Sequence, residues 1–202
     1  MIPLSAQKLY TAEQSRELDR IAIEQRGIAG IRLMKRAGRA LFDEIGKRWP
    51  NKPLTIVCGA GNNAGDGYIV AALAAEKGMR VNVVQVVTSS KLKGDARRAF
   101  DYAVQAGVRM VPFSDCVELE DGVIVDALLG TGFSGSPREP VAQAIRWINQ
   151  SASQSGSPVA SADIPSGLSA DTGHADLAVK ADLTCSFISL KQGVLTGRGP
   201  EL

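Results

Sequence analysis

Three stretches of the sequence place carboxylate and amide side chains directly after short apolar runs. They are GAGNNAGDG at 59–67, VDALLGTGFSG at 125–135 and DIPSGLSADTG at 163–173. Glycines allow backbone amides to approach a phosphate closely, and the start of a following helix favours negative charge. Carboxylates at such positions can move protons or hold a cation. The three stretches therefore predict a site that combines anion binding with acid–base chemistry.

The first stretch is compatible with dinucleotide binding. The pattern G-x-G-x-x-A at 59–64 matches the dinucleotide fingerprint, although short glycine patterns are common in turns. The next apolar run, 81–90, ends without the acidic residue that binds the ribose of NAD in a dehydrogenase. A Rossmann oxidoreductase is therefore the weaker alternative. The additional side chains of Asn62, Asn63 and Asp66 supply oxygen ligands and hydrogen-bonding groups beside the predicted anion site.

The second and third stretches each carry a carboxylate near the end of an apolar run. Asp126 lies within the run at 123–129. A buried carboxylate must be hydrogen-bonded, paired with a charge or bound to a cation. Asp163 directly follows the run at 159–162, at the end of a strand where ligands bind in parallel α/β sheets. The alternative for both is a tight turn in which the aspartate caps backbone amides.

The elements that must position these loops alternate along the chain. Thr11 and Gln14 fit a capping box for a helix that Gly27 ends, and a second amphipathic helix is expected at 31–49. We then expect strands at 54–58, 81–87, 108–112, 123–129, 159–162 and 183–189, and helices at 67–77, 94–107 and 141–149. Unbroken apolar strands separated by helices are typical of a parallel sheet covered on both faces. The predicted fold is a three-layer α/β/α Rossmann-like sandwich with a mostly parallel central sheet.

The composition predicts a single domain over residues 1–202. The 202 residues are 45% hydrophobic and 22% charged, and the formal net charge of +2 is too small for a general nucleic-acid-binding surface. The polar segment at 151–157 is expected to be a connector that is too short to separate domains. No apolar run approaches the roughly 18 residues that cross a bilayer, and the first residues lack a signal-peptide core. We therefore expect a cytoplasmic protein with neither nucleic acid nor a membrane as its partner.

The sequence also argues against zinc chemistry and a disulfide framework. The cysteines Cys58, Cys116 and Cys185 are odd in number and widely spaced, and no pair has zinc-ligand spacing. Cys58 is expected to be a reduced thiol packed within its strand. His174 is the only histidine, and we expect it to be exposed in a loop.

The motifs GNNxGDG, VDALLGTG and DIPSGLxADTG, in this order, resemble those of the YjeF N-terminal domain family. The resemblance covers nearly the whole chain, from the helical segment that begins at residue 17 to the closing GRGPEL. Ala64 and Ser169 replace a usual glycine and aspartate, and Lys35 stands where Glu or Gln is frequent. The resemblance implies an isomerase, an NAD(P)H-hydrate epimerase. Such an enzyme interconverts the R and S forms of NADH or NADPH that are hydrated at C6 of the nicotinamide ring.

The resemblance further implies which residues form the site. One potassium ion per subunit is expected to be bound by Asn63, Asp126 and Ser166. The residues expected to contact the hydrated dinucleotide are Asn62, Asn63, Ala64, Gly65, Asp66, Gly130, Thr131, Gly132, Phe133, Ser134, Gly135, Ser136 and Asp163. Asp163 is expected to act as the acid/base, and Asp126 to hold the cation and shape the local field. Lys191, in the LKxG segment, either approaches the site as a further catalytic group or is solvated.

The resemblance implies partners as well. An ADP- or ATP-dependent NAD(P)H-hydrate dehydratase is expected as a fused or separate partner, and the chain would then be the front part of a bifunctional enzyme. A homodimer is expected, with the N-terminal helices at its interface. These helices carry an apolar stripe that consists of Leu33, Met34, Ala37 and Leu41. The alternative role of this stripe is to cover the sheet. The remaining alternative is a non-catalytic scaffold module of the same family, which has no reason to keep the Asn, Asp and Ser set.

Overall fold

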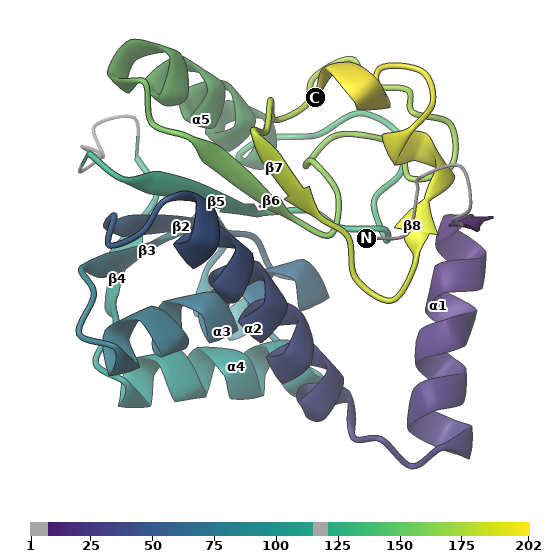
Figure 1. Cartoon of the computed structure of the whole chain (residues 1–202), viewed down its shortest axis with the longest axis horizontal. Helices are drawn as coiled ribbons and strands as arrows, with labels where there is room; N and C mark the ends of the chain where they lie inside the picture. Colours follow the sequence, from purple (N-terminus) through teal and green to yellow (C-terminus); the bar gives the residue numbers. More distant parts are fainter. Residues whose placement is uncertain (1–7, 115–120) are drawn as a thin grey trace.

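A computed structural model describes residues 8–114 and 121–202 of the chain. Within these ranges, six parallel strands form the central sheet in the order β4-β3-β2-β5-β6-β7 (Figure 1). The strands are β2 (Leu54–Cys58), β3 (Val81–Gln85), β4 (Arg109–Pro112), β5 (Val123–Ala127), β6 (Val159–Ala162) and β7 (Leu183–Cys185). The predicted parallel sheet is confirmed, so the loops that follow β2, β5 and β6 leave the same edge of the sheet.

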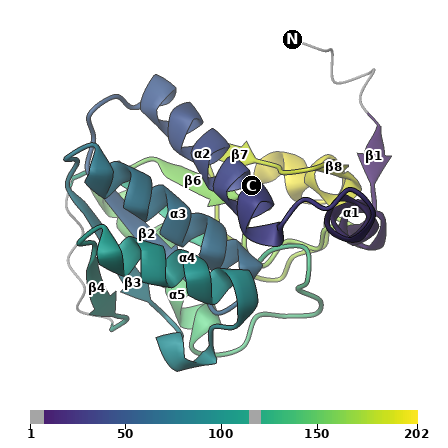
Figure 2. The same ribbon diagram turned by 90° about the horizontal axis from the view of Figure 1, so that it is seen from below.

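Helices cover both faces of this sheet. The helices are α1 (Ala12–Arg20), α2 (Gly30–Arg48), α3 (Asn62–Glu76), α4 (Gly94–Gln105) and α5 (Val141–Ser155). Figures 1 and 2 show α2, α3 and α4 side by side on one face and α5 on the other. Each face has its own apolar cluster, so the predicted three-layer sandwich is confirmed.

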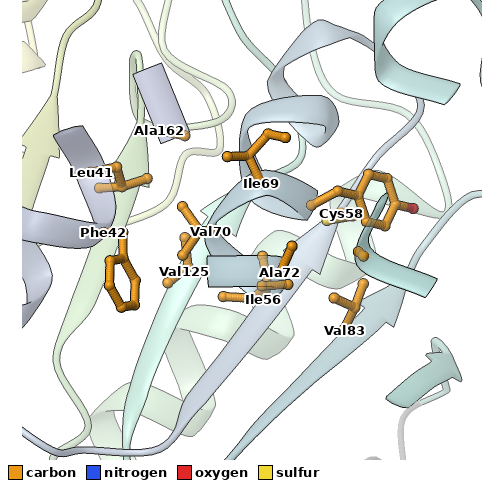
Figure 3. Packing of buried hydrophobic residues seen from close by; sticks show 14 of the residues in the cluster. Leu41, Phe42, Ile56, Cys58, Ile69, Val70, Ala72, Val83, Val125 and Ala162 are labelled. Carbon is orange, nitrogen blue, oxygen red and sulfur yellow. The ribbon is translucent and has the colours of Figure 1, made fainter. Parts of the chain in front are cut away.

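The helix α3 is the central element of the larger cluster. Its residues are buried without interruption from Asn63 to Ala74. Figure 3 shows Ile69, Val70 and Ala72 of α3 packed with side chains of the strands and of α2. A Cβ atom on Gly67 would lie 2.6 Å from the Cβ of Ala127, so glycine is what allows α3 to sit this close to the sheet. The start of α3 is therefore held rigidly against the strand ends.

Several predicted boundaries are wrong. The helix α3 begins at Asn62 rather than at 67, because burial of the whole helix overrides the low helix propensity of its glycine and asparagine residues. The helix α5 continues to Ser155 and ends at Gly156, whose φ of 70° suits a helix terminus. The predicted connector at 151–157 is thus mostly helix. The strands β3, β5 and β7 end earlier than predicted.

A second small sheet was not predicted from the sequence. The strand β1 (Leu9–Tyr10) pairs in parallel with β8 (Leu190–Lys191), and Tyr10 lies opposite Lys191. Figure 1 shows α1 beside β8 and separate from the layer of α2, α3 and α4. The capping box at the start of α1 is confirmed, and a π-helical turn (Ile21–Gln25) extends the helix. Two segments that are far apart in the sequence, 9–10 and 190–191, therefore lie side by side.

The remaining expectations concern cysteines, histidine and membranes. Cys58 is buried and Cys185 partly buried, and both are free thiols, while Cys116 lies outside the described residues. Burial, together with nearby carboxylates, raises the pKa of the Cys185 thiol to about 11. His174 is exposed as expected. Among the described residues, no helix is both long enough and apolar enough to cross a membrane.

Candidate functional site

The junction between β2 and α3 forms one wall of the site. After Cys58 the chain turns through Gly59 and Gly61, and α3 starts at Asn62. A Cβ atom on Gly59 would overlap the carbonyl group of Leu128, so the loops after β2 and β5 approach each other closely at this point. The positive end of the α3 dipole and its free backbone amides consequently lie beside the loop that follows β5.

Asp126 and Ser166 are joined by hydrogen bonds behind this junction. The Oδ1 atom of Asp126 accepts a hydrogen bond from Ser166 Oγ at 2.6 Å. The Oδ2 atom accepts bonds from the Ser161 hydroxyl and the Ser166 amide, both at 2.9 Å. Asp126 has no exposed surface, and this burial raises its pKa while the bonds from Ser166 and Ser161 oppose the shift. The aspartate thereby fixes the loop that follows β6 to the strand β5.

Asn63 completes the same cluster. Its Nδ2 atom donates to the Leu129 carbonyl at 2.7 Å, and Ser166 Oγ lies 3.2 Å from the same carbonyl oxygen. The Oδ1 atom of Asn63 is buried but accepts no hydrogen bond from the described residues. A buried amide oxygen without a donor is costly unless a ligand or an ion binds there. The structure thus brings together the three residues predicted to bind a cation, and one of them presents a free oxygen.

Asp163 and Lys191 form a buried ion pair at the end of β6. The Lys191 ammonium donates to the Asp163 carboxylate and to the Phe187 carbonyl, the latter at 2.7 Å. The amide of Phe187 also donates to Asp163, at 3.2 Å. The side chain of Lys191 is only 1% exposed, so of the two alternatives considered for it, the solvated lysine is excluded and Lys191 approaches the site. Lys191 belongs to β8, whose backbone pairs with β1.

These elements surround a cavity of about 1150 Å³ at the carboxyl ends of the strands. The predicted site residues that line it are Asn62, Asn63, Asp66, Gly130, Thr131, Gly132, Phe133, Ser134, Asp163 and Lys191. The predicted site residues outside the lining are Ala64, Gly65, Gly135, Ser136, Asp126 and Ser166. Ser136 instead donates to Asp176 at 2.6 Å, and Asp126 and Ser166 lie behind the wall. The lining has a polar end at Asp163 and apolar sides from α2.

The helix α1 contributes residues that were not predicted. Ser15, Arg16 and Asp19 line the cavity, and the guanidinium of Arg16 donates to the Thr131 carbonyl at 3.1 Å. Ser15, Asp19 and Ile23 recur every four residues, so they lie on one face of the helix. This spacing was the available signal, but the sequence did not reveal that this face turns toward the strand ends.

Three carboxylates in the cavity influence one another. Burial, followed by the negative charges of Asp163 and Asp19, holds the pKa of Asp66 well above its usual range. Burial and Asp163 likewise raise the pKa of Asp19. The ammonium of Lys191 opposes both shifts. Asp66 and Asp19 therefore hold their protons more tightly than exposed carboxyl groups do, and carboxyl groups perturbed in this way are typical of functional sites.

A parallel α/β sandwich with a glycine-rich strand–helix junction and a polar cavity at the strand ends defines a small-molecule-binding protein of the Rossmann-like class. The chain belongs to the family described as YjeF-related protein N-terminus, whose model matches residues 30–193. The resemblance noted in the motifs is thereby confirmed. The match includes the three strand-end loops and Lys191.

Named relatives agree with this membership. The chain is 41% identical over 194 residues to a bifunctional NAD(P)H-hydrate repair enzyme of Coxiella burnetii; the match covers 95% of this chain and 39% of that protein. It is 34% identical over 197 residues to an NAD(P)H-hydrate epimerase of Pirellula staleyi, with 93% of this chain and 85% of that protein covered. The chain thus spans less than half the length of the bifunctional relative.

A solved structure agrees with the fold. The crystal structure of the yeast protein ynu0 (YNL200c) superimposes with a TM-score of 0.84 at 20% sequence identity, covering 96% of this chain and 86% of the yeast chain. At this identity the likeness supports the α/β fold alone.

Proposed function

We propose that the protein is an NAD(P)H-hydrate epimerase, which interconverts the R and S forms of hydrated NADH and NADPH. The observation that carries the proposal is the Asp163–Lys191 pair, which faces a large cavity beside a dinucleotide-type strand–helix junction. The Pirellula staleyi relative, which carries this activity in its name, matches over most of both chains.

The chemistry of the substrate explains why such a pair is useful. In the hydrated cofactor, C6 of the nicotinamide ring carries a hydroxyl group and is bonded to the ring nitrogen. When the C6–O bond breaks, the oxygen takes a proton and leaves as water, and the nitrogen lone pair forms a C=N⁺ double bond. Water then adds to C6 from the opposite face and gives up a proton. The reaction needs one group that donates and recovers a proton, and a negative environment for the cationic intermediate.

Residues of the cavity can fill both roles. The Asp163 carboxylate, bridged to the Lys191 ammonium, is the proposed acid/base. It passes a proton from Lys191 to the departing oxygen and returns to Lys191 the proton that the adding water gives up. The charge of Asp163 supplies the negative environment for the ring, and Asp19 lines the same cavity. The junction at Asn62 and the loop from Gly130 to Ser134 bind the dinucleotide phosphates through backbone amides.

The oxygen cluster behind the wall is suited to potassium. Asn63 Oδ1, Asp126 and Ser166 Oγ are hard oxygen donors, and Asn63 Oδ1 has no hydrogen-bond partner in the described part of the chain. The set contains a single carboxylate, so one monovalent cation neutralises it, whereas a divalent ion would leave excess charge. When bound, the ion would compensate the charge of Asp126 and join the loops after β2, β5 and β6. Asp126 is then a positioning residue, since it has no exposed surface.

The proposed setting is cytoplasmic, with an NAD(P)H-hydrate dehydratase as a fused or separate partner that removes the water from one epimer. The name of the Coxiella burnetii relative, a bifunctional repair enzyme, supports this partnership. We also propose a homodimer in which the N-terminal helices form the interface. Light scattering should give the mass of two chains at micromolar concentration; the mass of one chain would exclude the dimer but leave the proposed activity untouched.

The activity is tested by chiral analysis of hydrated NADPH. Pure R epimer is incubated with the protein at neutral pH in potassium buffer, and the appearance of S epimer is compared with the spontaneous rate. Acceleration by the protein supports the proposal. A rate equal to the spontaneous exchange contradicts it and favours a non-catalytic module, provided that the protein used is folded and includes the chain through Leu202.

A further inference from the structure

The backbone at Ile188 has an unusual conformation. Its φ angle is 63°, a left-handed value that is a genuine outlier for a β-branched residue. The amide of Ser189 donates to the Phe187 carbonyl at 2.6 Å, which closes a three-residue turn around Ile188. Together these features match the rare and strained form of the γ-turn. Glycine or asparagine would adopt this conformation with less strain.

Neighbouring groups hold the turn in place from both sides. Phe187 is bound through its amide to Asp163 and through its carbonyl to Lys191. On the other side, the hydroxyl groups of Ser189 and Ser15 are hydrogen-bonded to each other at 3.0 Å. Strained residues persist where the surroundings determine the backbone in this way, and they are concentrated at functional sites. The turn is therefore built around the proposed acid/base pair.

The side chain of Ile188 does not serve the protein core. It is 51% exposed, and it lines the cavity together with Phe187 and Ile23. An exposed isoleucine contributes little to folding, and its β-branch adds to the strain of the turn. Its apolar surface is useful only when something else covers it.

We propose that Ile188 is a substrate-contacting residue whose side chain packs against the apolar carbons of the hydrated nicotinamide ring. This inference rests on the proposed function and identifies the ring of the substrate as the occupant of this part of the cavity. The partly saturated ring is uncharged and presents an apolar face, which an isoleucine can cover. The same turn binds both Asp163 and Lys191, so a ring held against Ile188 has its C6 atom close to the pair.

Two substitutions at Ile188 separate contact from strain. Ile188→Asn keeps a residue that tolerates the left-handed backbone and removes the apolar surface. We expect its KM for hydrated NADPH to rise about tenfold, as for the loss of a half-covered isoleucine contact. Its kcat should stay within roughly twofold of the wild-type value, and its melting temperature should be equal or higher. Ile188→Leu keeps the apolar surface and should retain a KM near that of the wild type.

A matched control is Val104→Ala, which removes an exposed apolar side chain from α4, outside the cavity. It should leave KM unchanged. An unchanged KM in Ile188→Asn overturns the proposal. A melting temperature lowered by several degrees also overturns it, because the side chain would then serve the fold.

A second readout separates this inference from the proposed function. The melting temperature of each variant is measured with and without hydrated NADPH. If the wild-type protein is stabilised by the ligand but does not epimerise it, the proposed function fails. In that case, the contact is still supported if hydrated NADPH no longer stabilises Ile188→Asn. It is overturned if the ligand stabilises Ile188→Asn as much as the wild type. If the ligand does not stabilise the wild-type protein and is not epimerised, both proposals fail.

Discussion

Lys191 donates a hydrogen bond to Asp163 from a position that is only 1% exposed, and it belongs to the short strand β8, which pairs with β1. A buried ammonium group is stable only beside a counter-charge. The position of β8, which carries Lys191, therefore affects the carboxylate that faces the cavity. Loss of either partner should affect both activity and stability.

Replacement of Asp163 by Asn should reduce turnover. The amide keeps the shape of the side chain but cannot exchange protons, and general acid–base groups typically contribute about 10²- to 10⁴-fold. We expect kcat for hydrated NADPH to fall within this range at saturating substrate. Asp121→Asn, which removes an exposed carboxylate far from the cavity lining, is the control and should leave kcat unchanged. An increase in KM alone would make Asp163 a binding residue.

The same substitution should also destabilise the fold, since it leaves the charge of Lys191 uncompensated. Removal of one partner of a buried ion pair typically costs about 3–5 kcal/mol. The double variant Asp163→Asn with Lys191→Met should be more stable than Asp163→Asn alone, because it removes the unpaired charge. Urea unfolding of the wild type, the single variants and the double variant measures this coupling. Additive effects would show that the two side chains do not stabilise each other.

Asp66 should make the protein less stable at neutral than at acidic pH. Its folded pKa is held well above the unfolded value by burial, Asp163 and Asp19, with Lys191 opposing. The folded state therefore keeps a proton that the unfolded chain loses above pH of about 4, and stability falls as the pH rises from there through the folded pKa. Asp66→Asn removes this pH-dependent loss of stability, because asparagine does not titrate.

The melting temperature of Asp66→Asn should therefore exceed that of the wild type at pH 7.5, and the difference should shrink toward pH 4. Thermal unfolding at both pH values measures it. Asp121→Asn serves again as the exposed control, with no pH-dependent gain expected. An equal gain at both pH values would mean that titration of Asp66 is not its cause.

Potassium should stabilise the protein by mass action. Only the folded state assembles the oxygen cluster, so free potassium at ten times its Kd adds about 1.4 kcal/mol. The melting temperature should be higher in potassium chloride than in tetramethylammonium chloride at equal ionic strength. Asn63→Ala should abolish the difference, whereas Asn62→Ala should retain it, because Asn62 is exposed outside the cluster. Identical melting temperatures of the wild type in both salts would exclude a cation site.

Arg16→Ala should weaken substrate binding with little effect on folding. The guanidinium of Arg16 ties α1 to the Thr131 carbonyl in the loop proposed to bind phosphates. A hydrogen bond of this kind is worth about 0.5–1.5 kcal/mol, so KM should rise about two- to tenfold. Arg20→Ala is a matched control, because Arg20 is bonded to Glu17 and Glu24 on the same helix. Equal KM values for the two variants would show that the bond between Arg16 and Thr131 does not contribute to substrate binding.

The strand-end loops could be predicted because each follows a buried strand, and parallel strands end at one edge of the sheet. This reasoning placed Asp126 within one strand and Asp163 directly after another, and the structure confirms both placements at β5 and β6, which pair with each other. That Asn63 and Ser166 lie close to Asp126 was implied by the family motifs. The length of α3 was missed, since glycine and asparagine favour loops when their burial is unknown.

Features that depend on contacts between distant segments were not predictable. The pairing of β1 with β8, the strand that carries Lys191, involves two residues of each, and such short strands leave no periodic signal. Whether Asp19 points into the cavity depends on where α1 packs. The φ angle of Ile188 is imposed by the hydrogen bonds of its two neighbours, because Phe187 is bonded to Asp163 and Lys191, and Ser189 to Ser15. These contacts exist only once the tertiary structure has formed.

The pairing of Tyr10 with Lys191 has a consequence for biosynthesis. A nascent chain can form β2, β3, β4 and β5 before the ribosome has translated the codon for Lys191, and domains fold progressively from the N-terminal side. The strand β1 must then wait for β8, a partner that lies far from it in the sequence. Chains released before Lys191 is translated would lack the lysine that binds Asp163. The proposed acid/base pair is therefore completed only after all strands of the central sheet have been translated.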